Sequence, residues 1–160
     1  MTDQINTIQA FVGKHADDLG NLISLQIKPL YESLGIVVPV KSVSIVYQLS
    51  QTPQASLADL SKALGQSHQL VKQKIPKLLK AGIINANHDP ADKRKTLYAL
   101  TALGQQQAQL LKQHSLEQVY RHLSAEIGAD LGQVLTQAIA GLKNKDLLSR
   151  FQSINHDKTP

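Results

Sequence analysis

Two glutamines, Gln69 and Gln73, stand four residues apart, a spacing that places both side chains on one face of a helix. A primary amide donates and accepts hydrogen bonds, so each glutamine can form a bidentate pair with the edge of an adenine base. Such a pair discriminates against a wrong base by about 1–3 kcal/mol. The two glutamines therefore have the chemistry of base readout. An ordinary exposed helix face rich in Gln and Lys explains them equally well.

The cations of the chain are concentrated around these glutamines. Between Lys62 and Lys95 there are eight Lys or Arg residues and two Asp residues, a local charge of +6. The rest of the chain holds nine cations and ten acids, so this fifth of the sequence accounts for the net charge of +5. Such a patch is typical of proteins that bind nucleic acid, because each phosphate contact releases counterions. A solvated lysine surface is the alternative.

The segment Asp89–Gly104, DPADKRKTLYALTALG, is the second cationic element. Its Asp-Pro pair begins a turn, three cations follow at 93–95, and the segment 96–100 has the pattern of a strand. A short extended run at 83–88 provides a second strand. We therefore expect a hairpin with a basic tip, followed by a helix that Thr101 caps.

Two short helices joined by a tight turn are predicted before this hairpin. Ser56 is an N-cap with Asp59 three residues later, which is a capping box, and Gly65 ends that helix. Ser67 caps the next helix, which runs to Ala81. This arrangement predicts a helix-turn-helix, whose second helix enters the major groove, and the hairpin makes it a winged helix.

The second of these helices has two distinct faces at 100° per residue. Its inner face has Val71, Ile75 and Leu78. The outer face has Gln69, Lys72, Gln73, Pro76, Lys77 and Lys80. Because proline lacks a backbone N–H, Pro76 removes the hydrogen bond to the Lys72 carbonyl, and we expect it to bend the helix.

Amphipathic helices are predicted on both sides of the winged helix. The first runs from Ile5 to Leu34, and we expect Pro29 to kink or interrupt its last turns. A second helix spans 40–50, with Val43, Val46, Tyr47 and Leu49 facing inward. After the hairpin we expect one helix from Ala102 to Leu123, another that Ser124 caps, and a short segment from Lys145 to Ile154. The small winged unit cannot cover all these apolar residues, so the first helix and the last two are expected to form a homodimer.

With these elements in order, the sequence resembles the MarR family of transcriptional regulators over about Val37 to Gly104. The motifs that carry the resemblance are Asp89-Pro90-x-Asp92-Lys93-Arg94, Leu100-Thr101-x-x-Gly104, Ser56-Leu57-x-x-Leu60-Ser61-x-x-Leu64-Gly65 and Leu78-x-x-x-Gly82-Ile83-Ile84. The resemblance implies that Arg94 enters the minor groove from the wing and that Asp92 holds it in place. Lys74 departs from the family, which more often has an aliphatic residue there.

The predicted site has nine residues that contact DNA and one that supports the wing. The DNA-binding residues are Ser67, His68, Gln69, Lys72, Gln73, Lys77, Lys93, Arg94 and Lys95. Asp92 is the supporting residue. Among the nine, the lysines are expected to bind phosphates and fix the register on the duplex.

The predicted fold is mostly α with a small β-wing. A winged helix-turn-helix at 36–101 is flanked by an N-terminal dimerisation helix at 1–35 and by C-terminal dimerisation helices at 102–160. Such a homodimer would bind a pseudo-palindromic operator in double-stranded DNA, its two recognition helices ~34 Å apart. The resemblance implies a repressor that a small-molecule effector releases from DNA, with the effector in a cleft between the dimer helices and the winged domain. The alternatives are a nonspecific or architectural nucleic-acid-binding protein and a metal-responsive regulator.

Other classes of protein are not expected. The chain has no Cys, which excludes disulfides and thiolate ligands. It has no paired-carboxylate motif, Gly-rich phosphate loop or Ser/His/Asp arrangement, so we expect neither an enzyme nor a cofactor. The polar N-terminus is not a signal peptide, and no segment approaches the ~20 apolar residues of a membrane span, which predicts a cytoplasmic protein without a membrane partner. The six His residues include no i, i+4 pair, so a metal site would need distant ligands such as His15, His114 and Glu32 or Glu117.

Overall fold

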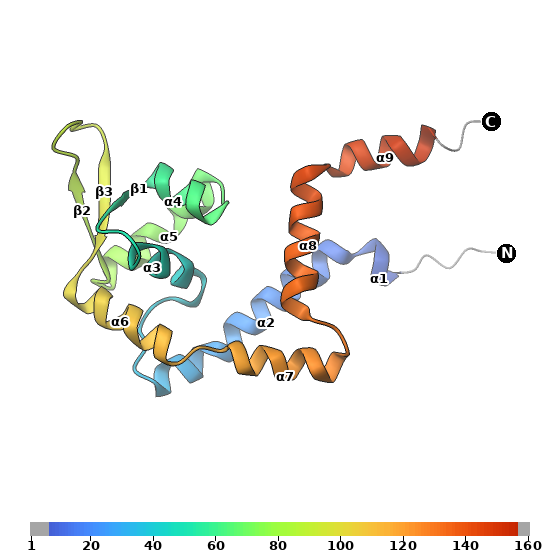
Figure 1. Cartoon of the computed structure of the whole chain (residues 1–160), viewed down its shortest axis with the longest axis horizontal. Helices are drawn as coiled ribbons and strands as arrows, with labels where there is room; N and C mark the ends of the chain where they lie inside the picture. The colour runs from blue at the N-terminus through green and yellow to red at the C-terminus, as the bar shows by residue number, and fades with distance from the viewer. Residues whose placement is uncertain (1–6, 157–160) are drawn as a thin grey trace. The chain divides into compact units, whose positions relative to one another are not determined.

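The computed structural model describes residues 7–156, so Ile5 of the predicted first helix lies outside the described residues. The chain divides into two compact units, one within residues 1–114 and the other within 115–160. Figure 1 shows the elements of both units, coloured from blue at the N-terminus to red at the C-terminus. Each unit is described by itself.

The first unit begins with two helices in place of the single helix predicted. They are α1, Thr7–Ala10, and α2, Val12–Ser33. Phe11 separates them because its backbone angles, φ −116° and ψ 31°, lie outside the helical region. The helix α2 continues through Pro29, so of the two predicted effects of this residue, a kink or an interruption, the interruption does not occur. It ends before Gly35, whose φ of +69° favours glycine.

The segment predicted as a helix at 40–50 is a 3-10 turn, η1 at Val40–Ser42, followed by the helix α3 at Val43–Leu49. Its buried face consists of Ser42, Ile45, Val46 and Leu49. Those positions follow the helical spacing i, i+3, i+4 and i+7, which leaves Tyr47 on the outer side. The prediction that Tyr47 faces inward is therefore wrong, since its side chain is 53% exposed.

The predicted helix-turn-helix is confirmed as α4, Leu57–Leu64, and α5, His68–Lys80. The hydroxyl of Ser56 accepts from the Asp59 N–H at 3.2 Å, and the Asp59 carboxylate accepts from the Ser56 N–H at 2.9 Å, which completes the capping box. Gly65 ends α4 with φ +59°, and the hydroxyl of Ser67 caps α5. The helix α5 is continuous through Pro76.

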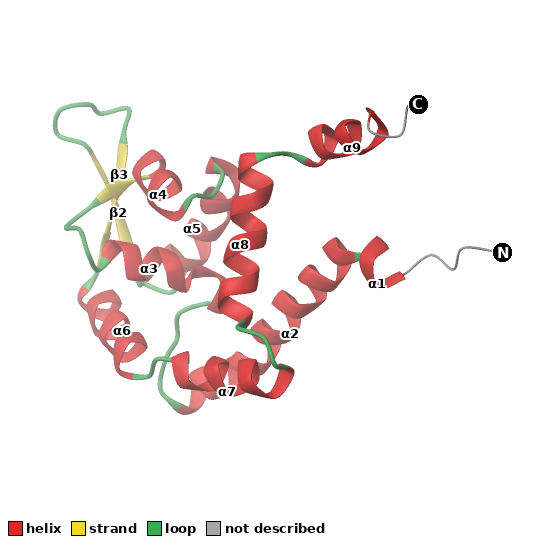
Figure 2. Ribbon diagram, turned by 45° about the vertical axis from the view of Figure 1, so that its right-hand side comes forward, coloured by secondary structure: helices red, strands yellow, loops and turns green. Residues whose placement is uncertain are grey.

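The wing is a three-stranded antiparallel sheet in the order β1-β3-β2. The strands β2, Ile84–His88, and β3, Thr96–Leu100, form the predicted hairpin (Figure 2). The two-residue strand β1, Ala55–Ser56, was not predicted from the sequence. It pairs with Leu97 and Tyr98 of β3, which ties the start of α4 to the wing.

The core of the first unit lies between the helix-turn-helix, α3 and the sheet. Its most deeply buried large side chains are Ile45, Val46, Leu60, Val71, Leu78 and Ile83. The helix α6, Ala102–Gln113, begins against this core. Its N-cap hydroxyl, on Thr101, donates to the Gly82 carbonyl at 2.6 Å and accepts from the Gly104 N–H at 3.0 Å. The wing and the following helix are therefore fixed to the turn at 82–83.

The second unit contains α7, Glu117–Ile127, α8, Leu131–Asn144, and α9, Leu147–His156. The single helix predicted from Ala102 to Leu123 is wrong, because α6 ends at Gln113 and the backbone of His114 leaves the helical region. Ser124 lies inside α7, not at the N-cap position, although its hydroxyl accepts from the N–H of Leu131, the first residue of α8, at 3.1 Å. Asp130 caps α8 instead, accepting from the Gln133 N–H at 2.9 Å.

Apolar side chains remain exposed on the outer helices of each unit. In the first unit these include Ile8, Val12, Leu22, Leu25 and Leu30. In the second unit they are Val119, Ile127, Val134, Leu135, Ile139, Leu142, Leu147, Leu148, Phe151 and Ile154. Every residue of α7 and α8 is at least partly exposed in the single chain. Burial of these faces would require a partner.

Candidate nucleic-acid interface

The outward face of α5 presents the predicted contact residues to solvent. Gln69, Lys72, Gln73 and Lys77 are all exposed. The opposite face is anchored, because Val71, Ile75 and Leu78 are at most 5% exposed. The packing of the opposite face against the core therefore fixes the orientation of α5 about its own axis, with the two glutamine amides and the lysines directed outward.

The N-terminus of α5 has a structural role as well as exposed polar groups. The hydroxyl of Ser67 accepts from the Leu70 N–H at 3.3 Å, so this residue stabilises the helix. His68 is the first residue of the helix and its side chain is exposed. The positive end of a helix dipole favours phosphate, which agrees with a contact at this position.

Hydrogen bonds between neighbouring residues shape the tip of the wing. The Asp89 carboxylate accepts from the Ala91 N–H at 2.8 Å, and the Asp89 N–H donates to the Lys95 carbonyl at 2.9 Å. The Asp92 carboxylate accepts from the backbone N–H of Arg94 at 3.0 Å. Asp92 thus positions Arg94 through its backbone.

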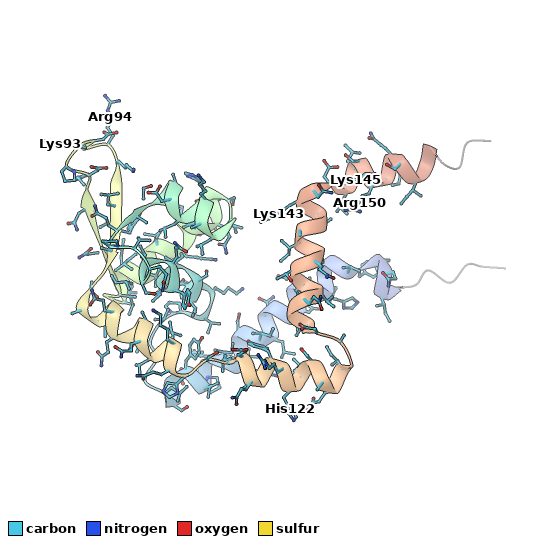
Figure 3. The ribbon with its side chains drawn as sticks, viewed as in Figure 1. Lys93, Arg94, His122, Lys143, Lys145 and Arg150 are labelled. Atoms are coloured by element: carbon cyan, nitrogen blue, oxygen red, sulfur yellow. The ribbon has the colours of Figure 1, made fainter. Side chains whose placement is uncertain are left out.

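The three cations of the tip, Lys93, Arg94 and Lys95, are exposed. Figure 3 shows Arg94 extending from the end of the hairpin, away from the body of the first unit. A long cationic side chain in this place has the reach to enter a groove next to the one that α5 would occupy. A narrow minor groove attracts arginine because negative potential is concentrated there.

Lys74 differs from the other lysines of α5 because it is half-buried. Its ammonium group donates to the Gln66 side-chain carbonyl at 2.9 Å. Burial, and next the charge of Lys41, lower the pKa of Lys74. Lys74 therefore links α5 to the preceding turn.

The start of α4 contributes to the charge balance of the same region. Hydrogen bonds from the hydroxyl and backbone N–H of Ser56 hold the pKa of Asp59 below its ordinary value, and Lys95 and Lys62 lower it further. Asp59 thus stays ionised at neutral pH. The capping box keeps its charge-assisted hydrogen bonds there.

The model that describes the MarR family matches residues 39–96. This range contains α3, the helix-turn-helix and the wing through the first residue of β3. Residues 39–96 are thus a segment of MarR-family type. Regulators of this family bind DNA, typically as dimers, and are not enzymes.

Solved structures share the fold over most of the chain. The Adhesin competence repressor (AdcR) from Streptococcus pyogenes is 25% identical, with a TM-score of 0.54 over 83% of this chain and 96% of that chain. A probable transcriptional regulator from Pseudomonas aeruginosa is 17% identical, with a TM-score of 0.62 over 84% and 98%. The heme sensor protein PefR from Streptococcus agalactiae, in complex with heme, is 19% identical, with a TM-score of 0.57 over 93% and 98%.

No curated protein matches the sequence. Within residues 7–156, no helix has the length and apolar content to cross a membrane. The same part of the chain has no group of three or more His, Asp or Glu residues arranged to hold a metal ion. The ligands that the sequence suggested for a metal site, such as His15 and His114, are thus not brought together within the described part of one chain.

Proposed function

We propose that this protein is a MarR-family regulator, a homodimeric, sequence-specific repressor that a small-molecule effector releases from DNA. The observation that carries the proposal is the exposure of all nine predicted contact residues on two elements that the same core anchors, α5 and the wing. A recognition helix with a neighbouring wing is the geometry of winged-helix proteins on duplex DNA.

In this proposal α5 lies in the major groove. Gln69 and Gln73 read base edges, because their amides stand one turn apart on the outer face. Lys72 and Lys77 bind phosphates, and Ser67 and His68 approach the backbone at the helix N-terminus. The phosphate contacts give affinity and register, and the amides give specificity.

The wing supplies the second contact. Arg94 enters the minor groove while Lys93 and Lys95 bind the flanking phosphates. Asp92 supports this contact by fixing the backbone at Arg94, which accords with their 3.0 Å hydrogen bond.

Dimerisation is assigned to residues 1–35 and 102–160, and DNA binding to 36–101. The support comes separately from each unit. The helices α1 and α2 leave Ile8, Val12 and Leu22 exposed, and α8 leaves Val134, Leu135, Ile139 and Leu142 exposed. These apolar residues are too numerous for a soluble monomer surface of this size. Two-fold symmetry would place two copies of α5 in successive major grooves.

An effector has a suitable place beside α5. A hollow of about 650 Å³ is lined by Ser24, Lys28, Tyr31 and Glu32 of α2, by Gly35 to Val40, and by Lys77 of α5. Because Lys77 is also a proposed phosphate contact, a ligand in this hollow would bind the DNA-free state better and shift the population toward it. The similar AdcR is named a competence repressor, which supports the same direction of control.

Selection of binding sites from random duplexes tests the proposal. We expect the selected sequences to share two inverted half-sites, with centres about one helical turn apart. Binding to the selected duplex should weaken steeply as salt rises, because phosphate contacts release counterions. Recovery of no common sequence would indicate the nonspecific, architectural protein instead.

A further inference from the structure

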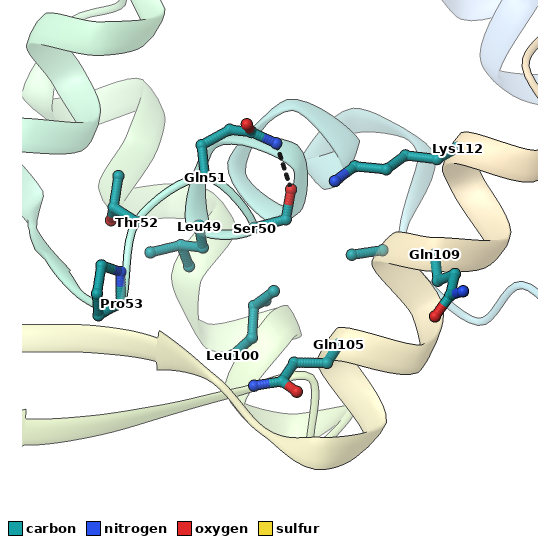
Figure 4. Close-up of a pocket in the computed structure, with 10 residues that line it drawn as sticks. Leu49, Ser50, Gln51, Thr52, Pro53, Leu100, Gln105, Gln109 and Lys112 are labelled. Carbon is teal, nitrogen blue, oxygen red and sulfur yellow. Dashed lines mark hydrogen bonds between the residues drawn. The ribbon is translucent and has the colours of Figure 1, made fainter.

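A second hollow, of about 670 Å³, lies on another side of the first unit (Figure 4). It is bounded by the end of α3, the loop 50–53, the end of β3 and the helix α6. It shares no lining residue with the hollow assigned to the effector, and none of the nine proposed DNA contacts lines it. Its volume falls in the range of small-molecule sites.

The lining has one polar side and one apolar side. Gln105, Gln109 and Lys112 follow one another at helical spacing along one face of α6. The loop opposite presents the polar groups of Ser50, Gln51 and Thr52. The apolar part of the lining consists of Leu49, Pro53, Leu100 and Ala108. No acidic residue lines the hollow, and Lys112 is its one cation, so the charge of the site favours an anion over a cation.

The two sides differ in how much of their hydrogen-bonding capacity is already used. The Gln51 amide donates to the Ser50 hydroxyl at 3.0 Å, and that hydroxyl donates to the Tyr47 carbonyl at 2.7 Å. These two hydrogen bonds stabilise the conformation of the loop. Within residues 7–156, no hydrogen bond engages the side-chain amides of Gln105 and Gln109. The Lys112 ammonium lies 5.6 Å from the centroid of the Tyr47 ring. Two amides and a cation are thus available to a ligand.

We infer that this hollow binds a small organic carboxylate with an apolar body. The carboxylate pairs with Lys112 and accepts hydrogen bonds from the amides of Gln105 and Gln109. The apolar body lies against Pro53 and Leu100, whose hydrocarbon surface is still in contact with water, and its binding removes that surface from water. An occupant would bridge α3, β3 and α6 without covering α5 or the tip of the wing.

Titration of the full ¹⁵N-labelled chain with benzoate, without DNA, tests the inference. Benzamide and benzylamine serve as the neutral and cationic analogues of nearly the same shape. We expect benzoate to shift the side-chain amide signals of Gln105 and Gln109 and the backbone signals of residues 50–52, in a saturable manner. Benzamide should bind about fivefold more weakly, which is the effect of one exposed ion pair, and benzylamine should not bind.

The variant Lys112→Ala should reduce benzoate binding to the level of benzamide, and Lys143→Ala, on α8, should leave it unchanged. The spectrum of each variant will show whether its fold is intact. Equal binding of benzoate and benzamide, benzoate shifts confined to other residues, or a folded Lys112→Ala variant with full benzoate affinity would overturn the inference. Because no DNA is present, these outcomes are independent of the proposed repressor function.

Discussion

The carboxylate of Asp92 accepts a hydrogen bond of 3.0 Å from the backbone N–H of Arg94. Asp92 therefore positions Arg94 through the main chain. This bond does not involve the guanidinium group of Arg94. The Lys95 N–H closes the same turn by donating to the Asp92 carbonyl at 2.9 Å. One acidic residue thus sets the conformation of a tip whose other charges are positive.

Replacement of Asp92 should weaken DNA binding through this turn. Asp92→Ala removes the acceptor, and we expect operator affinity to fall by about 1 kcal/mol, the net value of one hydrogen bond. Asp92→Asn keeps a side-chain oxygen and should lose less. Fluorescence anisotropy with a labelled operator measures both variants. If Asp92→Asn weakens binding as much as Asp92→Ala does, the hydrogen bond to the Arg94 N–H does not account for the loss of affinity.

Gly104 should tolerate no side chain. A Cβ at this position would lie 2.0 Å from the carbonyl oxygen of Ile83, a backbone atom that cannot move away on its own. We expect Gly104→Ala to lower the free energy of unfolding by about 1–3 kcal/mol, measured by urea denaturation. Gly13→Ala is the matched control, because its Cβ meets no atom within 4 Å. Equal stability of the two variants would contradict the close approach of α6 to the turn at 82–83.

Gln107 should stabilise the segment that lines the proposed effector hollow. Its buried amide donates to the Gly35 carbonyl at 3.0 Å and accepts from the Val37 N–H at 2.8 Å. Gln107→Ala leaves both backbone groups without this partner, and we expect a loss of about 2–3 kcal/mol in stability. Hydrogen exchange at the Val37 N–H should become faster. The exposed neighbour provides the control, since Gln106→Ala should change neither quantity.

The capping box of α4 should make part of the stability depend on pH. The pKa of Asp59 is below its ordinary value of 3.8 in the folded state. A depressed carboxyl pKa contributes stability that is present above the unfolded pKa and is lost as pH falls through the folded pKa. We therefore measure the free energy of unfolding of the wild type and of Asp59→Asn by urea denaturation from neutral pH to about 2. The difference between the two proteins should become smaller as the pH falls. A difference in free energy of unfolding that stays constant over this pH range would show that it does not arise from the charge of Asp59.

Local signals in the sequence predicted much of this fold. Ser56, Ser67 and Thr101 cap the helices that their types and positions indicate, and Gly65 ends α4 in the left-handed conformation. Each of the three capping hydroxyls accepts from the backbone N–H three positions further along the chain, so the sequence alone contains the information for the cap.

The errors occurred where distant segments decide the structure, or where two local signals compete. The strand β1 exists because Ala55 and Ser56 meet β3, some 40 residues later, and two residues have no strand periodicity of their own. Ser124 and Asp130 are both suitable caps, and Gly128, with φ +68°, decides for Asp130 by ending α7 just before it. The exposure of Gln69, Lys72, Gln73 and Lys77 follows from the helix periodicity of α5. Their contacts with bases and phosphates remain predictions.

The central claim is that the outer face of α5 reads a DNA sequence. Its most direct test is the ratio of affinities for the selected operator and for a scrambled duplex, at one salt concentration, in wild type and in the Gln69→Ala/Gln73→Ala double variant. We predict a wild-type ratio of at least about 10³, and a fall of roughly 10-fold or more in the double variant with little change on scrambled DNA. Gln106→Ala should keep the wild-type ratio. A ratio near one in the wild type, or an unchanged ratio in the double variant, would contradict the claim.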